Sequence, residues 1–213
     1  PNTAIQLRFI RWDINGADAF YVYYADSVQT AADLTLYNST QDLLAGEIVS
    51  ESESGALTIR FAGSYNSKLN TGWEVEVSCH ALTALQLDSV VVSNASAGVA
   101  TKGSTDVPML QIAVCLSGDR GSIQVGQFNL TGMSDDVTPV LYYTGSGNTF
   151  ANTTAFDAHA PLTRKGTYYY WAALNIDSDA QEGVHTLACE SVQIDGIAVS
   201  PQQTALASLD IIS

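Results

Sequence analysis

Hydrophobic and polar residues alternate along most of this chain with a period of two, which is the spacing of β-strands that bury one face. The alternation is clearest on either side of the polar loop 63–72, in residues 57–62 and 73–79. We expect these two strands to pair as a hairpin. We also expect this hairpin to close a first domain, because the strands after Cys79 lack its pattern of apolar and charged residues.

The first part of the chain contains two further predicted strands. Residues 4–10 place Ile5, Leu7 and Phe9 on one face, and residues 20–24 follow after a turn-rich loop. Together with the hairpin, these strands indicate a β-sandwich over residues 1–80.

The second part of the chain contains a longer series of predicted strands, with turn signals at the spacing typical of β-sandwiches. The strands are expected at residues 85–92, 107–114, 121–130, 140–145, 166–174, 184–194 and 197–199. No helical pattern exceeds two turns. The sequence therefore predicts an all-β fold class, with two β-sandwich (jelly-roll-like) domains in tandem at residues 1–80 and 81–213.

The negative net charge of the chain disfavours some classes of binding partner. Eight basic and 22 acidic residues give a formal net charge of -14, which disfavours phosphate backbones and anionic membrane surfaces. We expect no nucleic-acid partner and, since no apolar run reaches about 18 residues, no membrane insertion. The chain begins at Pro1 without a basic leader and ends abruptly, so we expect a fragment of a longer protein.

Three cysteines, Cys79, Cys115 and Cys189, cannot all pair within one chain. Cys115 and Cys189 both fall in apolar strand patterns, which favours buried free thiols. A Cys115–Cys189 disulfide is the alternative.

Several motifs of the first domain occur in a recognisable order. They are an I-x-L-x-F strand at residues 5–9, an aspartate before an aromatic strand at 18–23, an L-x-x-x-F strand at 57–61, a Gly-Trp strand at 72–77, and Cys79. This order resembles the CUB domain. The match lacks the first strands and the first cysteine of that family, which implies an N-terminally truncated domain.

CUB domains often bind calcium through carboxylates, and the resemblance places Asp18 at one such position. The second aspartate of the family corresponds to Ser64, and the upstream glutamate is missing. Because calcium takes about six to eight oxygen ligands, we expect no metal site and expect Asp18 to cap its own loop. A residual calcium site near Asp18 remains the alternative.

The second domain carries a Y-Y-T-G motif at residues 142–145 and a G-x-x-Y-x-W motif at 166–171, with supporting similarity at 106–114 and 175–177. These residues resemble the domain found ahead of the catalytic propeller in bacterial BNR-repeat neuraminidases (sialidases) and in other secreted Bacteroidetes proteins. The resemblance implies an accessory module that binds glycan or packs against its enzyme, without a catalytic role.

The aromatic residues of these motifs are the candidate binding residues. Because side chains alternate along a strand, Tyr168 and Tyr170 share one face while Tyr169 and Trp171 share the other. One set belongs in the core, and an exposed set could stack on a sugar ring. The candidate ligand-binding residues are Tyr142, Tyr143, Tyr168, Tyr170 and Trp171.

Signatures of catalysis are missing from the sequence: it has no G-x-S-x-G elbow, H-E-x-x-H pair or Gly-rich phosphate loop. We therefore expect no enzyme activity and no cofactor. The hypothesis is a non-catalytic binding module of an exported bacterial multidomain protein, secreted or at the cell surface. It would bind a glycan, or a host or bacterial surface protein, beside neighbouring domains of its parent. The alternative is a structural spacer that positions a hydrolase, protease or adhesin domain.

Overall fold

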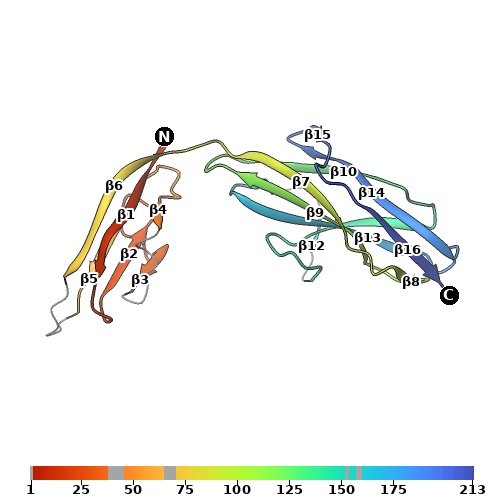
Figure 1. Ribbon diagram of the computed structural model, residues 1–213, viewed down its shortest axis with the longest axis horizontal. Helices are drawn as coiled ribbons and strands as arrows, with labels where there is room; N and C mark the ends of the chain where they lie inside the picture. The colour runs from red at the N-terminus through yellow and green to blue at the C-terminus, as the bar shows by residue number, and fades with distance from the viewer. Residues whose placement is uncertain (1, 38–45, 65–70, 152–153, 157–159) are drawn as a thin grey trace. The chain divides into compact units, whose positions relative to one another are not determined.

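Strands and loops make up the described part of the chain, which in this computed structural model comprises residues 2–37, 46–64, 71–151, 154–156 and 160–213 (Figure 1). No helix occurs among these residues, and the predicted all-β class is confirmed. The chain divides into two units, Pro1–Thr83 and Ala84–Ser213. The division expected from the sequence fell after residue 80.

The described residues of unit 1 form two three-stranded antiparallel sheets, with strand orders β4-β1-β6 and β3-β2-β5. The strands are β1 (Thr3–Asp13), β2 (Ala19–Tyr23), β3 (Leu34–Leu36), β4 (Glu47–Val49), β5 (Thr58–Ala62) and β6 (Gly72–Ala81). The alternation in residues 4–10 correctly located the buried face of β1, because Leu7 and Phe9 lie in the core.

The predicted hairpin at residues 57–79 is wrong. β5 pairs with β2 and β6 pairs with β1, so the two strands belong to different sheets. Their apolar sides nevertheless approach each other, with the ring centroids of Phe61 and Trp73 6.1 Å apart. Period-two alternation identifies the buried face of a strand but does not select its neighbour, and here the chain crosses between sheets.

Aromatic rings fill the core of unit 1. The Phe20 ring lies 5.4 Å from Phe9, 5.6 Å from Trp12 and 5.0 Å from Trp73, each in an edge-to-face arrangement that suits aromatic quadrupoles. The indole N–H of Trp12 donates to the carbonyl oxygen of Tyr37 at 3.2 Å. The strands of both sheets are therefore held together by one aromatic cluster.

In unit 2, the part of the chain that the structure describes forms two five-stranded sheets. Their orders are β10-β14-β16-β8, with β15 also paired to β14, and β12-β11-β13-β9-β7. The strands are β7 (Gln86–Asn94), β8 (Val99–Thr101), β9 (Val107–Ser117), β10 (Val125–Thr131), β11 (Val137–Tyr143), β12 (Thr154–Ala155), β13 (Gly166–Ile176), β14 (Gly183–Ile194), β15 (Ile197–Val199) and β16 (Leu206–Ile212). β16 pairs in parallel with β8, and the other strand pairs are antiparallel.

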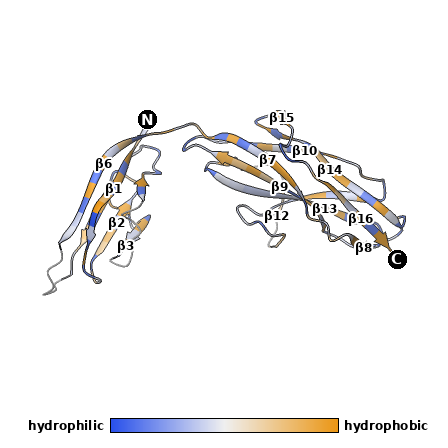
Figure 2. Ribbon diagram, in the orientation of Figure 1, coloured by the Kyte–Doolittle hydropathy of each residue, from blue (hydrophilic) through white to orange (hydrophobic). Residues whose placement is uncertain are grey.

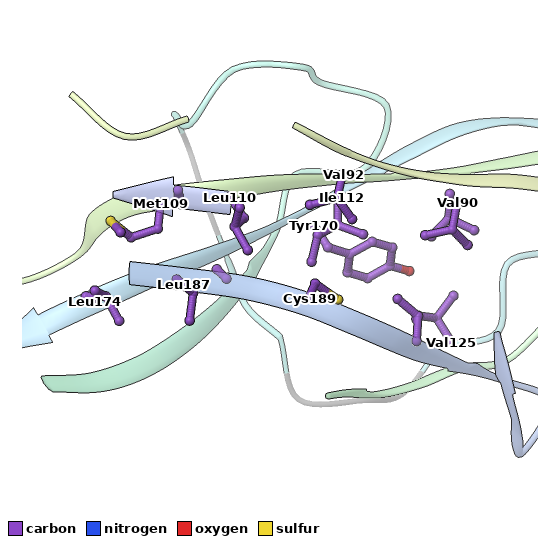
Figure 3. Close-up of a cluster of buried hydrophobic side chains, with 14 of the residues drawn as sticks. Val90, Val92, Met109, Leu110, Ile112, Val125, Tyr170, Leu174, Leu187 and Cys189 are labelled. Carbon is purple, nitrogen blue, oxygen red and sulfur yellow. The ribbon is translucent and has the colours of Figure 1, made fainter. Parts of the chain in front are cut away.

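The core of unit 2 lies between its sheets. Val92, Ile112 and Leu174 come from one sheet, Leu187 and Cys189 come from the other, and all five belong to one buried cluster (Figure 3). Alternate residues of these long strands are apolar, so each sheet offers a continuous hydrophobic face to the other. This face-to-face packing agrees with the predicted sandwich.

The three cysteines are unpaired, so the alternative of a Cys115–Cys189 disulfide is wrong. Cys189 enters the core, and burial raises the pKa of its thiol to about 11. Cys115 sits between Val114 and Leu116, which are buried, and its sulfur instead accepts a hydrogen bond from the Thr167 hydroxyl at 3.6 Å. The two sulfur atoms lie on different faces because neighbouring residues of a strand point in opposite directions.

Candidate binding site

Strand pairing sorts the aromatic residues of β11 and β13 between two faces of their sheet. Tyr143 lies opposite Tyr170, and Tyr142 lies opposite Trp171. Paired residues of an antiparallel ladder share a face, so Tyr143 and Tyr170 are directed to the inner face and the other pair to the outer face. The five candidate residues therefore do not form one site.

The inner face carries an aromatic cluster around Tyr170, whose side chain is surrounded by core residues (Figure 3). The centroid of its ring lies 5.0 Å from Tyr143, 5.1 Å from Phe156 and 5.2 Å from Phe128. Phe128 comes from β10 of the facing sheet, so the cluster bridges the sandwich. Close ring packing fixes the orientation of Tyr143 at its margin.

A cleft of about 430 Å³ opens beside this cluster. That volume falls within the range of small-molecule sites. Tyr143 and Tyr168 are half-buried beside it, whereas Tyr170 lies deeper. The described lining residues are Tyr143, Thr154, Ala155, Phe156, Ala160, Pro161, Leu162, Thr163, Arg164, Tyr168 and Tyr170.

The described polar side chains that line the cleft are three tyrosines, two threonines and Arg164. Burial, and then the neighbouring Tyr143 and Tyr168, raise the pKa of Tyr170 far above its usual value of 10.0. Burial and the neighbouring Tyr168 also raise the pKa of Tyr143. Both hydroxyls stay protonated at neutral pH and can donate hydrogen bonds.

The three tyrosine hydroxyls of the cleft differ in whether they form hydrogen bonds with other described residues. The Tyr168 hydroxyl donates to the Arg164 carbonyl oxygen at 2.9 Å, which holds the loop before β13 against the cleft. No hydrogen bond joins the Tyr143 or Tyr170 hydroxyl to another described residue. No carboxylate is found among the described lining residues.

The outer face is closed by the loop that follows β11. Trp171 is buried, and its indole N–H donates to the Thr144 hydroxyl at 3.0 Å. The Phe150 ring lies 5.5 Å from Trp171 and also 5.5 Å from Tyr142, while the Tyr142 hydroxyl donates to the Asp106 carboxylate. Trp171 and Tyr142 are therefore occupied by contacts within unit 2.

The cleft includes residues that sequence reasoning did not select. Phe156, Leu162 and Arg164 all come from the segment between β11 and β13, for which the sequence analysis predicted no strand and no binding residue. Part of this segment forms β12, and Leu162 pairs in a bridge with Ile123. Apolar residues such as Phe156 within a polar segment were the signal that it packs against the sheet.

Asp18 connects two loops of unit 1, and its predicted role as a cap is confirmed by its hydrogen bonds. One carboxylate oxygen accepts from the Asn15 amide at 3.0 Å. The other accepts from the Ser64 amide and hydroxyl at 2.6 and 2.8 Å. In the part of the chain that the structure describes, no group of three or more His, Cys, Asp or Glu residues could hold a metal ion.

This chain shows little similarity to known proteins. No family model matches the chain, and no curated protein matches it. Among solved structures, it is similar to a chain of a type I cohesin–dockerin complex from Clostridium thermocellum, with 12% identity and a TM-score of 0.20, over 61% of this chain and 100% of that chain. A score this low supports no inference about this protein. The resemblances to CUB domains and to neuraminidase accessory domains stay predictions.

Membrane crossing by a helix finds no support in the structure. Within the described ranges, no helix has the length and apolar character that such a span requires.

Proposed function

We propose that this chain is a non-catalytic binding module and that the cleft beside Tyr143 and Tyr168 takes a glycan. The observation that carries the proposal is an apolar cleft of about 430 Å³ whose aromatic walls bear phenol hydroxyls. Sugars have apolar C–H faces that pack on aromatic rings, and hydroxyls that exchange hydrogen bonds with polar side chains. Tyr143 and Tyr168 offer both kinds of contact.

The surrounding structure supports a rigid site. Tyr143 packs on Tyr170, and Tyr168 is anchored through its hydroxyl to the Arg164 carbonyl oxygen. Both strands that carry these tyrosines lie inside their sheet, β11 between β12 and β13, and β13 between β11 and β9. Preorganised side chains lose little conformational entropy on binding, which favours recognition of a weakly interacting ligand such as a sugar.

Glycan-array screening of the whole chain, followed by calorimetric titration with the best glycan, tests the proposal. We expect Tyr168→Ala to weaken binding about tenfold, equivalent to about 1.4 kcal/mol. Tyr169→Ala is the matched control, because it changes the same residue type at the next position of β13 but on the opposite face. Its affinity should equal that of the unchanged protein.

A second variant keeps the test valid if loss of Tyr168 disturbs the core. Thr163 is exposed and lines the cleft, so Thr163→Trp should fill the cleft and abolish binding without altering buried residues. Failure of a folded chain to bind any glycan would contradict the proposal, as would unchanged affinity in both Tyr168→Ala and Thr163→Trp.

The wider setting of the module belongs to the same proposal. On the strength of the sequence resemblances, we place it in an exported bacterial multidomain protein, secreted or at the cell surface. The alternative role as a spacer would be favoured by burial of Trp171 at a domain boundary. Trp171 is instead covered by Thr144 and Phe150 of its own unit, so its burial does not favour that role.

A further inference from the structure

β6 is a long strand with an open edge. It pairs with β1 from Thr3↔Ala81 to Asp13↔Gly72, and no other described strand pairs with it. Alternate residues of an edge strand direct their N–H and C=O groups away from the sheet, where they can pair with another strand. Among the described residues, β6 therefore ends its sheet, and the stretch around Val75 and Val77 offers its outer backbone edge to a further strand.

Other edges of the described sheets are shorter, irregular or covered. β12 has two residues, β3, β4 and β8 have three each, and β5 has five, while β10 shows two register shifts against β14, compared with one between β1 and β6. The edge of β7 is covered by residues 202–203, since the Val92 amide donates to Gln203 and the Gln202 amide donates to Val90. β6 also lacks proline and lysine, which commonly protect edges.

The apolar side of β6 extends beyond the core of unit 1. Leu7 on β1 is 1% exposed, whereas its direct neighbour Val77 on β6 is 60% exposed. Cys79, in the same row, is also exposed, while Trp73 and Val75 nearer the other end are half-buried. An added strand would cover this uncovered row with its own apolar side chains.

The other side of β6 carries two carboxylates, each paired with an arginine of β1 on the side away from the open edge. Glu76 pairs with Arg8 at 3.2 Å and Glu74 approaches Arg11 at 3.9 Å, and all four side chains are about half exposed. Figure 2 shows the resulting alternation of hydrophilic and hydrophobic residues along β6. Side chains of an adjoining strand would lie directly beside the two carboxylates, where basic residues are favoured and acidic residues are repelled.

We propose that β6 binds an extended segment of a partner protein as an additional strand, and that in this segment hydrophobic residues alternate with lysine or arginine. The hydrophobic residues would pack on Val75 and Val77, and the basic residues would lie beside Glu74 and Glu76. Main-chain hydrogen bonds would provide affinity, and the alternation would provide specificity.

A second copy of this chain fits the edge less well. Antiparallel self-pairing centred on Val77 would place Glu76 opposite Ser78 and Glu74 opposite His80, so the second copy would bring no lysine or arginine beside the carboxylates. It would also bring together two chains of formal net charge -14. A basic partner meets neither obstacle.

Hydrogen exchange measured by NMR on the whole chain tests the proposal. The probe is a capped synthetic peptide of the length of β6 in which valine alternates with lysine, and the matched control peptide has glutamate in place of lysine. We expect the lysine peptide to slow exchange of alternate β6 amides about tenfold while amides of β10 are unchanged. The glutamate peptide should have no effect.

Variants at exposed positions of β6 test separately the contribution of charge and the contribution of apolar contact to peptide binding. Glu76→Lys should weaken binding of the lysine peptide and permit binding of the glutamate peptide, because the charge beside the added strand is reversed. Val77→Lys should abolish binding of the lysine peptide. Val184→Lys, at a position of β14 that is 71% exposed, is the matched control and should leave binding unchanged.

Three results would overturn the proposal. The first is unchanged exchange of β6 amides with the lysine peptide, and the second is equal binding of both peptides. The third is protection of β6 amides that rises with protein concentration in the absence of peptide, which would assign the edge to a second copy. These measurements do not involve the cleft of unit 2, so their outcome is independent of glycan binding.

Discussion

Two aspartates of unit 1 each bind the amide and the hydroxyl of a serine or threonine. Asp18 accepts both hydrogen bonds of Ser64, and Asp13 accepts both hydrogen bonds of Thr71, at 2.7 Å each. In both cases the partners are far apart in sequence. The Asp18 carboxylate therefore holds the segment after β5 at the start of β2. The Asp13 carboxylate holds the segment before β6 at the end of β1.

Stability of unit 1 should depend on the charge of Asp18. Hydrogen bonds from Ser64 lower the pKa of this carboxyl from its usual 3.8, because they favour the ionised form. The stabilisation is complete above the pKa of the unfolded chain and is lost as the pH falls through the lower pKa of the folded state. Asp18→Asn should therefore lower the melting temperature at neutral pH and have little effect at strongly acidic pH.

Thermal melting of the protein and its variants across the acidic range measures this effect. Asp26→Asn is the control, since Asp26 is exposed and bonds to its neighbour Ser27 at 3.3 Å rather than to a distant loop. A difference between Asp18→Asn and the unchanged protein that stayed constant down to the lowest pH would show that the charge of Asp18 does not stabilise the fold.

At the scale of elements, the segment after β11 determines which aromatic residues are accessible. Residues 144–150 cover the outer side of Trp171 through Thr144 and Phe150. The Thr144 hydroxyl donates to the Gly147 carbonyl oxygen at 2.6 Å while it accepts from the indole of Trp171. A single hydroxyl therefore stabilises both the turn and the buried indole.

Loss of that hydroxyl should destabilise unit 2. Thr144→Val preserves the shape of the side chain but leaves the buried indole N–H of Trp171 without its partner, which costs about 1–3 kcal/mol. Urea unfolding followed by tryptophan fluorescence measures the change. Thr144→Ser retains the hydroxyl and should be close to the unchanged protein, whereas equal stability of all three would contradict the assigned role.

Strand positions were predictable because the signal that marks a strand is local. The alternation at residues 107–114 located β9, and that at 166–174 located β13, each within a few residues. Pairing was not predictable, since β5 joins β2 rather than β6 through contacts between residues remote in sequence. The candidate aromatic residues illustrate the same limit. Alternation placed Tyr170 and Trp171 on opposite faces of β13, but only the tertiary structure showed that both are buried.

At the scale of the whole molecule, each unit has its own core. The buried cluster around Phe20 contains residues of unit 1, and the cluster around Ile112 contains residues of unit 2. Hydrophobic burial is the main favourable contribution to folding, so each unit holds the principal source of its own stability.

The excised segment 84–213 should therefore fold by itself. We expect a single cooperative thermal transition and the near-ultraviolet circular dichroism of ordered tyrosine and tryptophan side chains. Segment 1–83, which has the smaller core, should be less stable. A segment 84–213 that unfolds gradually and lacks near-ultraviolet signal would show that its core is insufficient without unit 1.

The sequence by itself determined the all-β class, the positions of the main strands and which residues of a strand share a face, because side-chain alternation is a property of neighbouring residues. Tertiary structure decided what depends on residues far apart: the sheet in which β5 and β6 lie, the bond between Asp18 and Ser64, and the cleft. The cleft exists because Tyr143 and Tyr168 meet Phe156 and Arg164 from a separate segment. The open edge of β6 follows from the same cause, since a strand is an edge only when no other strand pairs with it.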